Sequence, residues 1–165
     1  MSCTILTDSD YAIVDREIIE KLKILASQSN LKRSRLCLHQ NLSDKVQEMV
    51  ITVCRGSYIP PHRQLNKKKS YNVIEGRMMI FFFDERGNIL RKIEMGLPGS
   101  DKPFIYRFSS SQWHTILPMT NSVTYIETIS GPYNKKETQF AKWAPSSDNS
   151  KESIKTFINN LTFYK

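Results

Sequence analysis

Short apolar runs separated by turn residues occupy most of the chain from residue 45 onward. They are rich in Val, Ile, Phe, Tyr and Thr, and they cover residues 46–54, 70–74, 78–83, 89–95, 104–108, 113–117 and 123–129. β-branched and aromatic residues fit the pleated, half-buried surface of a strand. Short strands spaced in this way are typical of an antiparallel sandwich or barrel. We therefore expect an all-β core.

Gly, Pro, Asn and Asp residues lie between these runs, where a chain must reverse direction. They occur at 75–76, 84–88, 96–99 and 118–121. These residue types supply the backbone conformations that tight turns require. The segment 84–88 joins two strand-like runs, so we predict a hairpin there.

Helical spacing of apolar residues is found only near the two ends. Ile18, Ile19, Leu22 and Leu25 predict an amphipathic helix within 15–27, and Ile154, Phe157, Ile158 and Leu161 follow a capping sequence at 149–152. We expect an N-terminal helix and basic connector over 1–34, a barrel over 35–145 and a C-terminal helix over 146–165. An isolated helix of this length is marginal in water, so the last helix packs on its own barrel or on a partner.

Length and cysteine content favour one cytoplasmic domain. The chain has 165 residues, of which 39% are hydrophobic, and a chain of that size buries a sizeable core. Cys3, Cys37 and Cys54 are too few and too widely spaced for a disulfide framework, which indicates reduced thiols. The first ten residues lack the basic and apolar regions of a secretory signal, and no apolar run is long enough to span a bilayer.

A net charge of +8, from 24 basic and 16 acidic residues, first indicates nucleic acid or an anionic surface. The basic clusters at 32–35 and 67–69 are short, and such runs are usually solvated. Binding to nucleic acid needs a basic stripe with exposed aromatic residues, whereas the aromatic run 81–83 reads as a buried strand. We therefore expect no nucleic-acid partner.

Two of the three histidines are candidates for chemistry. His62 follows two prolines and His114 begins a strand, so a small barrel can bring both side chains into its interior. His39 lies in a polar stretch, where a structural or exposed role is expected.

The motifs around these histidines closely resemble those of the WbuC family of cupin-fold proteins. The matching pieces are PPHR at 60–63, Lys69, SYNVIEG at 70–76, FFD at 82–84, Gly87, WHT at 113–115, GPY at 131–133 and FAKWAP at 140–145. The resemblance implies a single cupin barrel, that is, a double-stranded β-helix or jelly roll. It also implies a link to bacterial surface-polysaccharide (O-antigen) sugar metabolism.

The resemblance implies a metal site that is only partly kept. The usual cupin site takes two histidines and an acidic residue from the first motif and one histidine from the second. His62 and His114 match two of these ligands, but Gln64 replaces a histidine and Lys69 replaces the carboxylate. We expect His62, Gln64 and His114 to bind Zn, Fe, Ni or Mn weakly or not at all, because an ammonium repels a divalent cation.

The remaining candidates suit an anionic or sugar-like ligand. Arg63, Lys69, Tyr71, Tyr106 and Trp113 join the histidines in this proposed site, and cationic donors form strong hydrogen bonds to phosphate or carboxylate. Alternatively, the aromatic residues are core packing and Arg63 forms an ion pair with a carboxylate such as Glu75 or Asp84.

Three functional readings stay open at this point. The first is a small-molecule-binding cupin. The second is a sugar or sugar-nucleotide isomerase or epimerase in which His62 or His114 is the general base, while Lys69 and Arg63 hold a phosphate. The third is non-enzymatic: an accessory or sensor protein, or a homodimeric scaffold, since cupins often pair through their sheets.

Overall fold

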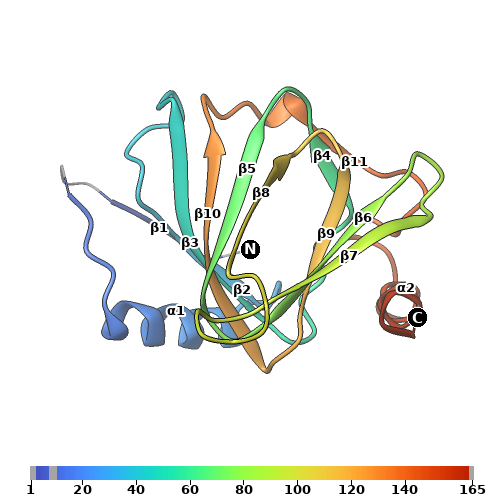
Figure 1. The fold of residues 1–165 in the computed structure, drawn as a ribbon, viewed down its shortest axis with the longest axis horizontal. Coiled ribbons are helices and arrows are strands. Elements are labelled where there is room, and N and C mark those ends of the chain that lie inside the picture. Colours follow the sequence, from blue (N-terminus) through green and yellow to red (C-terminus); the bar gives the residue numbers. More distant parts are fainter. Residues whose placement is uncertain (1–2, 8–10, 164–165) are drawn as a thin grey trace.

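Two β-sheets face each other in the computed structural model, which describes residues 3–7 and 11–163 (Figure 1). The six-stranded sheet contains, in spatial order, β1 (Cys3–Leu6), β2 (Arg33–Cys37), β3 (Val46–Cys54), β10 (Ser122–Ser130), β5 (Lys68–Glu75) and β8 (Ile105–Ser109). The five-stranded sheet contains β11 (Thr138–Phe140), β4 (His62–Gln64), β9 (Trp113–Pro118), β6 (Met78–Phe83) and β7 (Ile89–Met95). The helices are α1 (Arg16–Gln28), α2 (Lys151–Phe163) and the short 3₁₀ turn η1 (Lys135–Glu137).

The eight strands from β3 to β10 pair as a hairpin that has been rolled up. The antiparallel pairs are nested: β3 with β10, β4 with β9, β5 with β8, and β6 with β7. These pairs then lie side by side in two sheets, which is the strand order of a jelly roll. The predicted all-β jelly roll with a short helix towards each end is confirmed.

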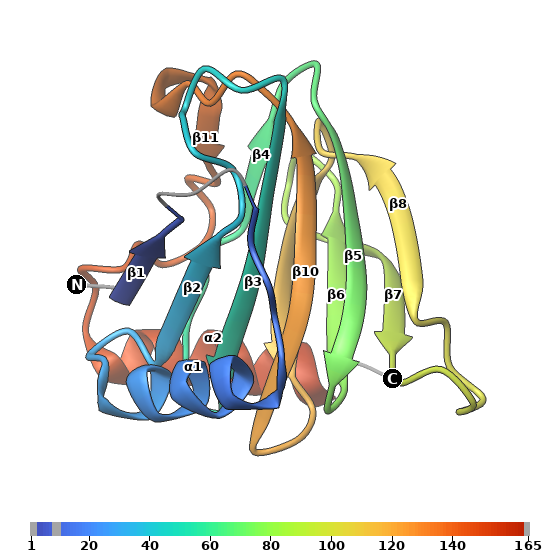
Figure 2. The same ribbon diagram turned by 90° about the vertical axis from the view of Figure 1, so that its left-hand side faces the viewer.

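All seven predicted strands are present, and β3, β6 and β7 have the predicted bounds. Four short strands were not predicted: β1, β2, β4 and β11. β2 lies partly in the stretch interpreted as a basic connector, and it continues the sheet beyond β3 (Figure 2). The division of the chain at residues 34 and 145 stays a prediction, and β2 crosses the first of these positions.

α1 begins where the sequence places a capping residue. The Asp15 carboxylate accepts a hydrogen bond from the Ile18 backbone N–H at 2.9 Å. Leu22 is fully buried against Leu36 of β2 and Val50 of β3. The helix therefore covers the outer face of the six-stranded sheet, as Figure 2 shows.

α2 packs on its own barrel, which answers the question that the sequence left open. Phe157, Ile158 and Leu161 join the cluster formed by Phe81 and Trp113 of the five-stranded sheet. Figure 1 shows the helix on the outer side of that sheet.

All three cysteines are free thiols. Among the residues that the structure describes, no helix combines the length and apolar character needed to cross a membrane.

The β6–β7 hairpin is held against the segment that leads to α2. Gly87 has a φ of +90°, and a Cβ at this position would lie 2.7 Å from the Trp143 ring. Gly99 has a similar φ of +87°, but a Cβ there would meet nothing within 4 Å. Substitutions at these two glycines therefore distinguish the cost of backbone strain from the cost of a steric clash.

We predict that Gly87→Ala destabilises the protein more than Gly99→Ala does. Backbone strain alone costs about 1–2 kcal/mol, and displacing the Trp143 ring adds about 1–3 kcal/mol. Urea denaturation of both variants measures the difference. Equal losses of unfolding free energy would show that Trp143 does not hold the hairpin.

Candidate functional site

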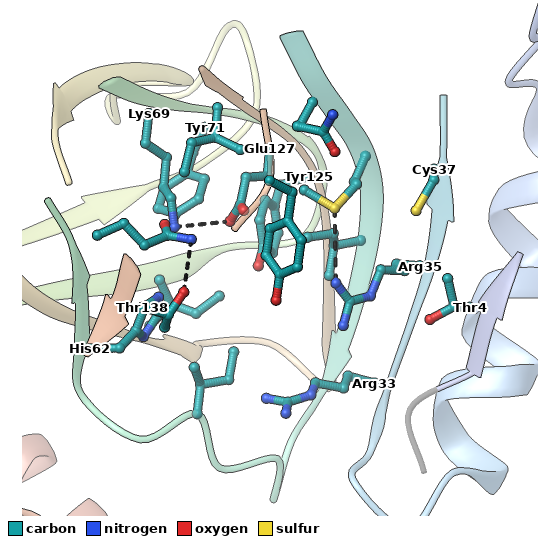
Figure 3. A pocket seen from close by; sticks show the side chains of 18 of the residues that line it. Thr4, Arg33, Arg35, Cys37, His62, Lys69, Tyr71, Tyr125, Glu127 and Thr138 are labelled. Atoms are coloured by element: carbon teal, nitrogen blue, oxygen red, sulfur yellow. Dashed lines mark hydrogen bonds and ion pairs between the residues drawn. The ribbon is translucent and has the colours of Figure 1, made fainter. Parts of the chain in front are cut away.

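A cavity of about 510 Å³ opens between the two sheets, and side chains from both line it (Figure 3). The predicted site residues that line it are His62, Gln64, Lys69 and Tyr71. His114 lies directly behind His62 and is fully buried. The structure therefore brings five of the predicted residues together.

His62 and His114 are paired across β4 and β9, with ring centroids 4.5 Å apart. The Nδ1 atom of His62 is 3.1 Å from the Pro60 carbonyl, and that of His114 is 2.8 Å from the Gln112 carbonyl. Because a carbonyl only accepts, each Nδ1 carries the proton and each Nε2 keeps a lone pair.

Both imidazoles are held in the neutral form. Burial is the main cause, and the nearby Lys69 charge adds to it; together they lower the pKa of His62 to about 3. Burial and the neighbouring His62 hold the pKa of His114 well below its ordinary value. At neutral pH the pair therefore offers hydrogen-bond acceptors but no positive charge.

Lys69 points into the barrel from β5 and is only 2% exposed. Its Nζ atom lies 3.5 Å from His114 Nε2 and 3.5 Å from the Glu127 carboxylate. The Tyr71 ring is beside it, with its centroid 5.8 Å from Nζ. The ammonium thus lies between an imidazole lone pair and a carboxylate.

Glu127 of β10 is a site residue that the sequence analysis did not identify. It lines the cavity, its side chain is 15% exposed, and it is the carboxylate partner of Lys69. Burial and this carboxylate raise the pKa of the Tyr71 hydroxyl, which stays neutral. The sequence pattern could have identified Glu127, because side chains alternate along the strand. This alternation places Glu127 on the same face as the buried Val123, Tyr125 and Ile129.

Gln64 contributes an amide whose carbonyl oxygen is buried without a hydrogen-bond partner among the described residues. Its NH₂ group donates weakly to the Thr138 hydroxyl at 3.4 Å. Since a buried unpaired acceptor is unfavourable, this oxygen is available to a donor from a ligand.

The residues present do not fit a tight divalent metal. Over the ranges 3–7 and 11–163, no three His, Cys, Asp or Glu side chains cluster in a way that could hold an ion. The Lys69 ammonium is 3.5 Å from His114 Nε2, the nitrogen whose lone pair would face an ion. At about 4 Å and an effective dielectric near 20, a unit charge repels a dication by roughly 8 kcal/mol.

Arg63 and Trp113 lie outside the cavity. Side chains alternate along β4, so His62 and Gln64 face inward while the Arg63 guanidinium stacks over the Trp113 ring at 4.2 Å. Arg63 also donates to the Glu85 carboxylate at 2.6 Å. Arg63 therefore forms an ion pair, as the alternative interpretation of the sequence expected, but its partner is Glu85 and not Glu75 or Asp84.

Tyr106 is partly buried against the core and does not line the cavity either. Its ring packs against Phe82 and Phe108, with centroid distances of 6.0 and 5.7 Å. His39 is fixed by the backbone of β3, because the Glu48 N–H donates to His39 Nδ1 at 3.1 Å.

A family model described as a domain of unknown function (DUF6016) matches residues 14–95. No curated protein matches the sequence.

Among solved structures, a CapF chain crystallised with the inhibitor 3-isopropenyl-tropolone is similar, with a TM-score of 0.54 and 18% identity over 68% of this chain and 32% of that one. Protein SO0799 from Shewanella oneidensis has a TM-score of 0.50 and 9% identity over 59% of this chain and 63% of that one. A cupin superfamily protein from Desulfitobacterium hafniense has a TM-score of 0.48 and 17% identity, covering 66% and 86%.

The matched region spans less than two thirds of the first two of these chains. At identities this low, the similarity is evidence for the fold alone. Together with the nested strand order, the CapF likeness supports the jelly-roll fold. Membership of the WbuC family stays a prediction.

The buried ion pair predicts a specific pattern of stability. Lys69→Met leaves the Glu127 charge buried without its partner and should lower the unfolding free energy by about 3 kcal/mol. Adding Glu127→Gln removes that charge and should restore most of the loss. Urea denaturation of the single and double variants measures both effects.

Lys23→Met is the matched control, because Lys23 forms ion pairs with Glu20 and Glu75 that are far more exposed. Its loss should stay within about 1 kcal/mol. If Lys69→Met costs no more than this control, the Lys69–Glu127 pair is not a buried pair in solution.

Restoring the usual cupin ligands should create a metal site. In the double variant Gln64→His with Lys69→Glu, two imidazoles and a carboxylate would join His114, and elemental analysis of tag-free protein should find about one metal ion per chain. Lys68→Glu, one residue away on the exposed face of β5, is the control and should bind none. A folded double variant without metal would show that residues 64 and 69 do not converge on one point.

Proposed function

We propose that this protein is a small-molecule-binding cupin that recognises an anionic sugar derivative through a buried ammonium in place of a metal ion. The observation that carries the proposal is the position of Lys69, whose Nζ lies inside the barrel beside His114 and Glu127. The volume of about 510 Å³ is typical of a site for a small organic ligand.

Charge supports an anionic ligand. The ionised side chains that line the cavity are Arg33, Arg35, Lys69 and Glu127, which give 3 − 1 = +2. Glu127 pairs with Lys69 and offsets one of the three positive charges, so two remain to attract an anion. An anionic ligand would neutralise it with charge-assisted hydrogen bonds.

Neutral polar groups support a ligand that carries hydroxyls. The unpaired carbonyl oxygen of Gln64 and the Nε2 lone pair of His62 accept hydrogen bonds, and hydroxyl groups of a sugar donate them. Tyr133 and Phe140 add large, exposed aromatic faces to the lining, and such faces pack against the C–H groups of a sugar ring. The motif resemblance supports surface-polysaccharide metabolism as the setting, and the few, widely spaced cysteines support a cytoplasmic location. Pairing of two copies is a further expectation.

The lowered pKa of His62 supports a role in ligand binding over a role in proton transfer. A general base works best when its pKa is near the working pH, whereas the pKa of His62 is lowered to about 3. The isomerase or epimerase alternative therefore lacks a well-matched histidine base in this structure. An accessory or sensor role needs only binding.

A calorimetric panel tests the proposal with glucose, glucose 1-phosphate, glucuronate and UDP-glucose as probes. We expect the wild type to bind charged probes more tightly than glucose. The double variant Lys69→Met with Glu127→Gln, which keeps the core free of an unpaired charge, should bind them at least about tenfold more weakly.

Lys68→Met is the control, because Lys68 neighbours Lys69 but is exposed on β5. It should bind like the wild type. Failure of every charged probe to bind the wild type, or equal binding by the double variant, would contradict the proposed function.

A further inference from the structure

Two arginines of β2 line one side of the cavity. Arg33 and Arg35 are two residues apart, so their side chains project from the same face of the strand. Ser34 between them faces the other way and donates to the Leu22 carbonyl of α1 at 2.7 Å. Figure 3 shows both guanidinium groups directed towards the cavity.

Neither arginine has a carboxylate partner within residues 3–7 and 11–163. Among the described residues the arginines that form ion pairs are Arg63 and Arg77. In the part of the chain that the structure describes, the side-chain hydrogen bonds of these arginines are a long one from Arg33 to the Tyr58 carbonyl at 3.5 Å and one from Arg35 to the Met49 sulfur at 3.9 Å. Most of the donor positions of both guanidinium groups are therefore open to a ligand.

The two positive charges repel each other in a partly buried place. The pKa of Arg33 is lowered, mainly because the side chain is buried and in part because the charge of Arg35 is near. Charges buried without a partner are unfavourable. A dianion between the two guanidinium groups would remove the repulsion and fill the open donors.

Tyr125 adds a neutral donor at the same place. In the sheet, Arg35 is opposite Ile51, and Ile51 is opposite Tyr125, so the three residues form one row. Burial raises the pKa of Tyr125 although Arg33 and Arg35 act against this rise, which keeps the hydroxyl protonated. No hydrogen bond of this hydroxyl to another described residue is formed, so it is free to donate to a ligand.

From these contacts we propose that Arg33, Arg35 and Tyr125 form a phosphate subsite, which binds the phosphate or diphosphate group of a phosphorylated sugar. The inference rests on the proposed function and adds the chemical class of the anion. Planar guanidinium groups match phosphate oxygens in pairs, and two of them balance the charge of a dianion.

The spacing of the strands that carry the subsite and Lys69 suits such a ligand. β2 and β5 are three strand spacings apart in the sheet, which is roughly 14 Å. A phosphate held by β2 would leave the sugar near His62, Gln64 and Lys69. β2 lies outside the eight nested strands, so this subsite is an addition to the jelly roll.

Calorimetry with inorganic pyrophosphate, glucose 1-phosphate and glucuronate tests the subsite. We expect Arg33→Gln and Arg35→Gln each to weaken binding of the two phosphorylated probes by about tenfold or more, and Arg35→Lys to weaken it less. Arg107→Gln, at an exposed position of β8, is the control and should bind like the wild type.

Thermal unfolding in phosphate-free buffer provides a second readout. Because each substitution removes a repelled charge, Arg33→Gln and Arg35→Gln should unfold at a temperature equal to or above that of the wild type. Pyrophosphate should raise the unfolding temperature of the wild type and of Arg107→Gln, but not that of the two cavity variants.

The outcomes separate the subsite from the proposed function. If glucuronate binds through Lys69 but pyrophosphate and glucose 1-phosphate do not bind, or bind the arginine variants as they bind the wild type, the subsite is wrong and the proposed function stands. If no charged probe binds the wild type, both are wrong.

Discussion

A lysine ammonium buried inside the barrel determines what this cavity can do. Lys69 Nζ lies 3.5 Å from both His114 Nε2 and the Glu127 carboxylate. Its charge repels a divalent ion, and together with burial it keeps His62 neutral. The carboxylate prevents an unpaired charge in the core. The first two effects disfavour metal binding and proton transfer by histidine, which supports the proposed anionic ligand.

The jelly roll brings these groups together from distant parts of the sequence. Lys69 is on β5, His114 on β9 and Glu127 on β10, and the nested pairing places all three around one interior. Alternation along β4 then separates two roles, because His62 faces the cavity while Arg63 holds the outer hairpin through Glu85. Two adjacent residues of one strand thus serve as a ligand-binding candidate on one face and as a surface contact on the other.

Periodicity predicted the long strands well, since β3, β6 and β7 are apolar runs between turn residues. It missed β4 and β11, which have three residues each, too few for a pattern to emerge. It also misread Arg33 and Arg35, because alternating basic residues look the same on a solvated edge and on a cavity wall. Glu127 was missed for a related reason: its partner is 58 positions away in the sequence (127 − 69), and only the strand register reveals the pair.

Metal analysis of tag-free wild-type protein tests the central claim most directly. The account predicts a metal content far below one ion per chain, unchanged by His62→Ala, because the Lys69 ammonium occupies the place of the ion's charge. A stoichiometric metal that His62→Ala removes would contradict it, since Lys69 would then have to lie away from His114 in solution.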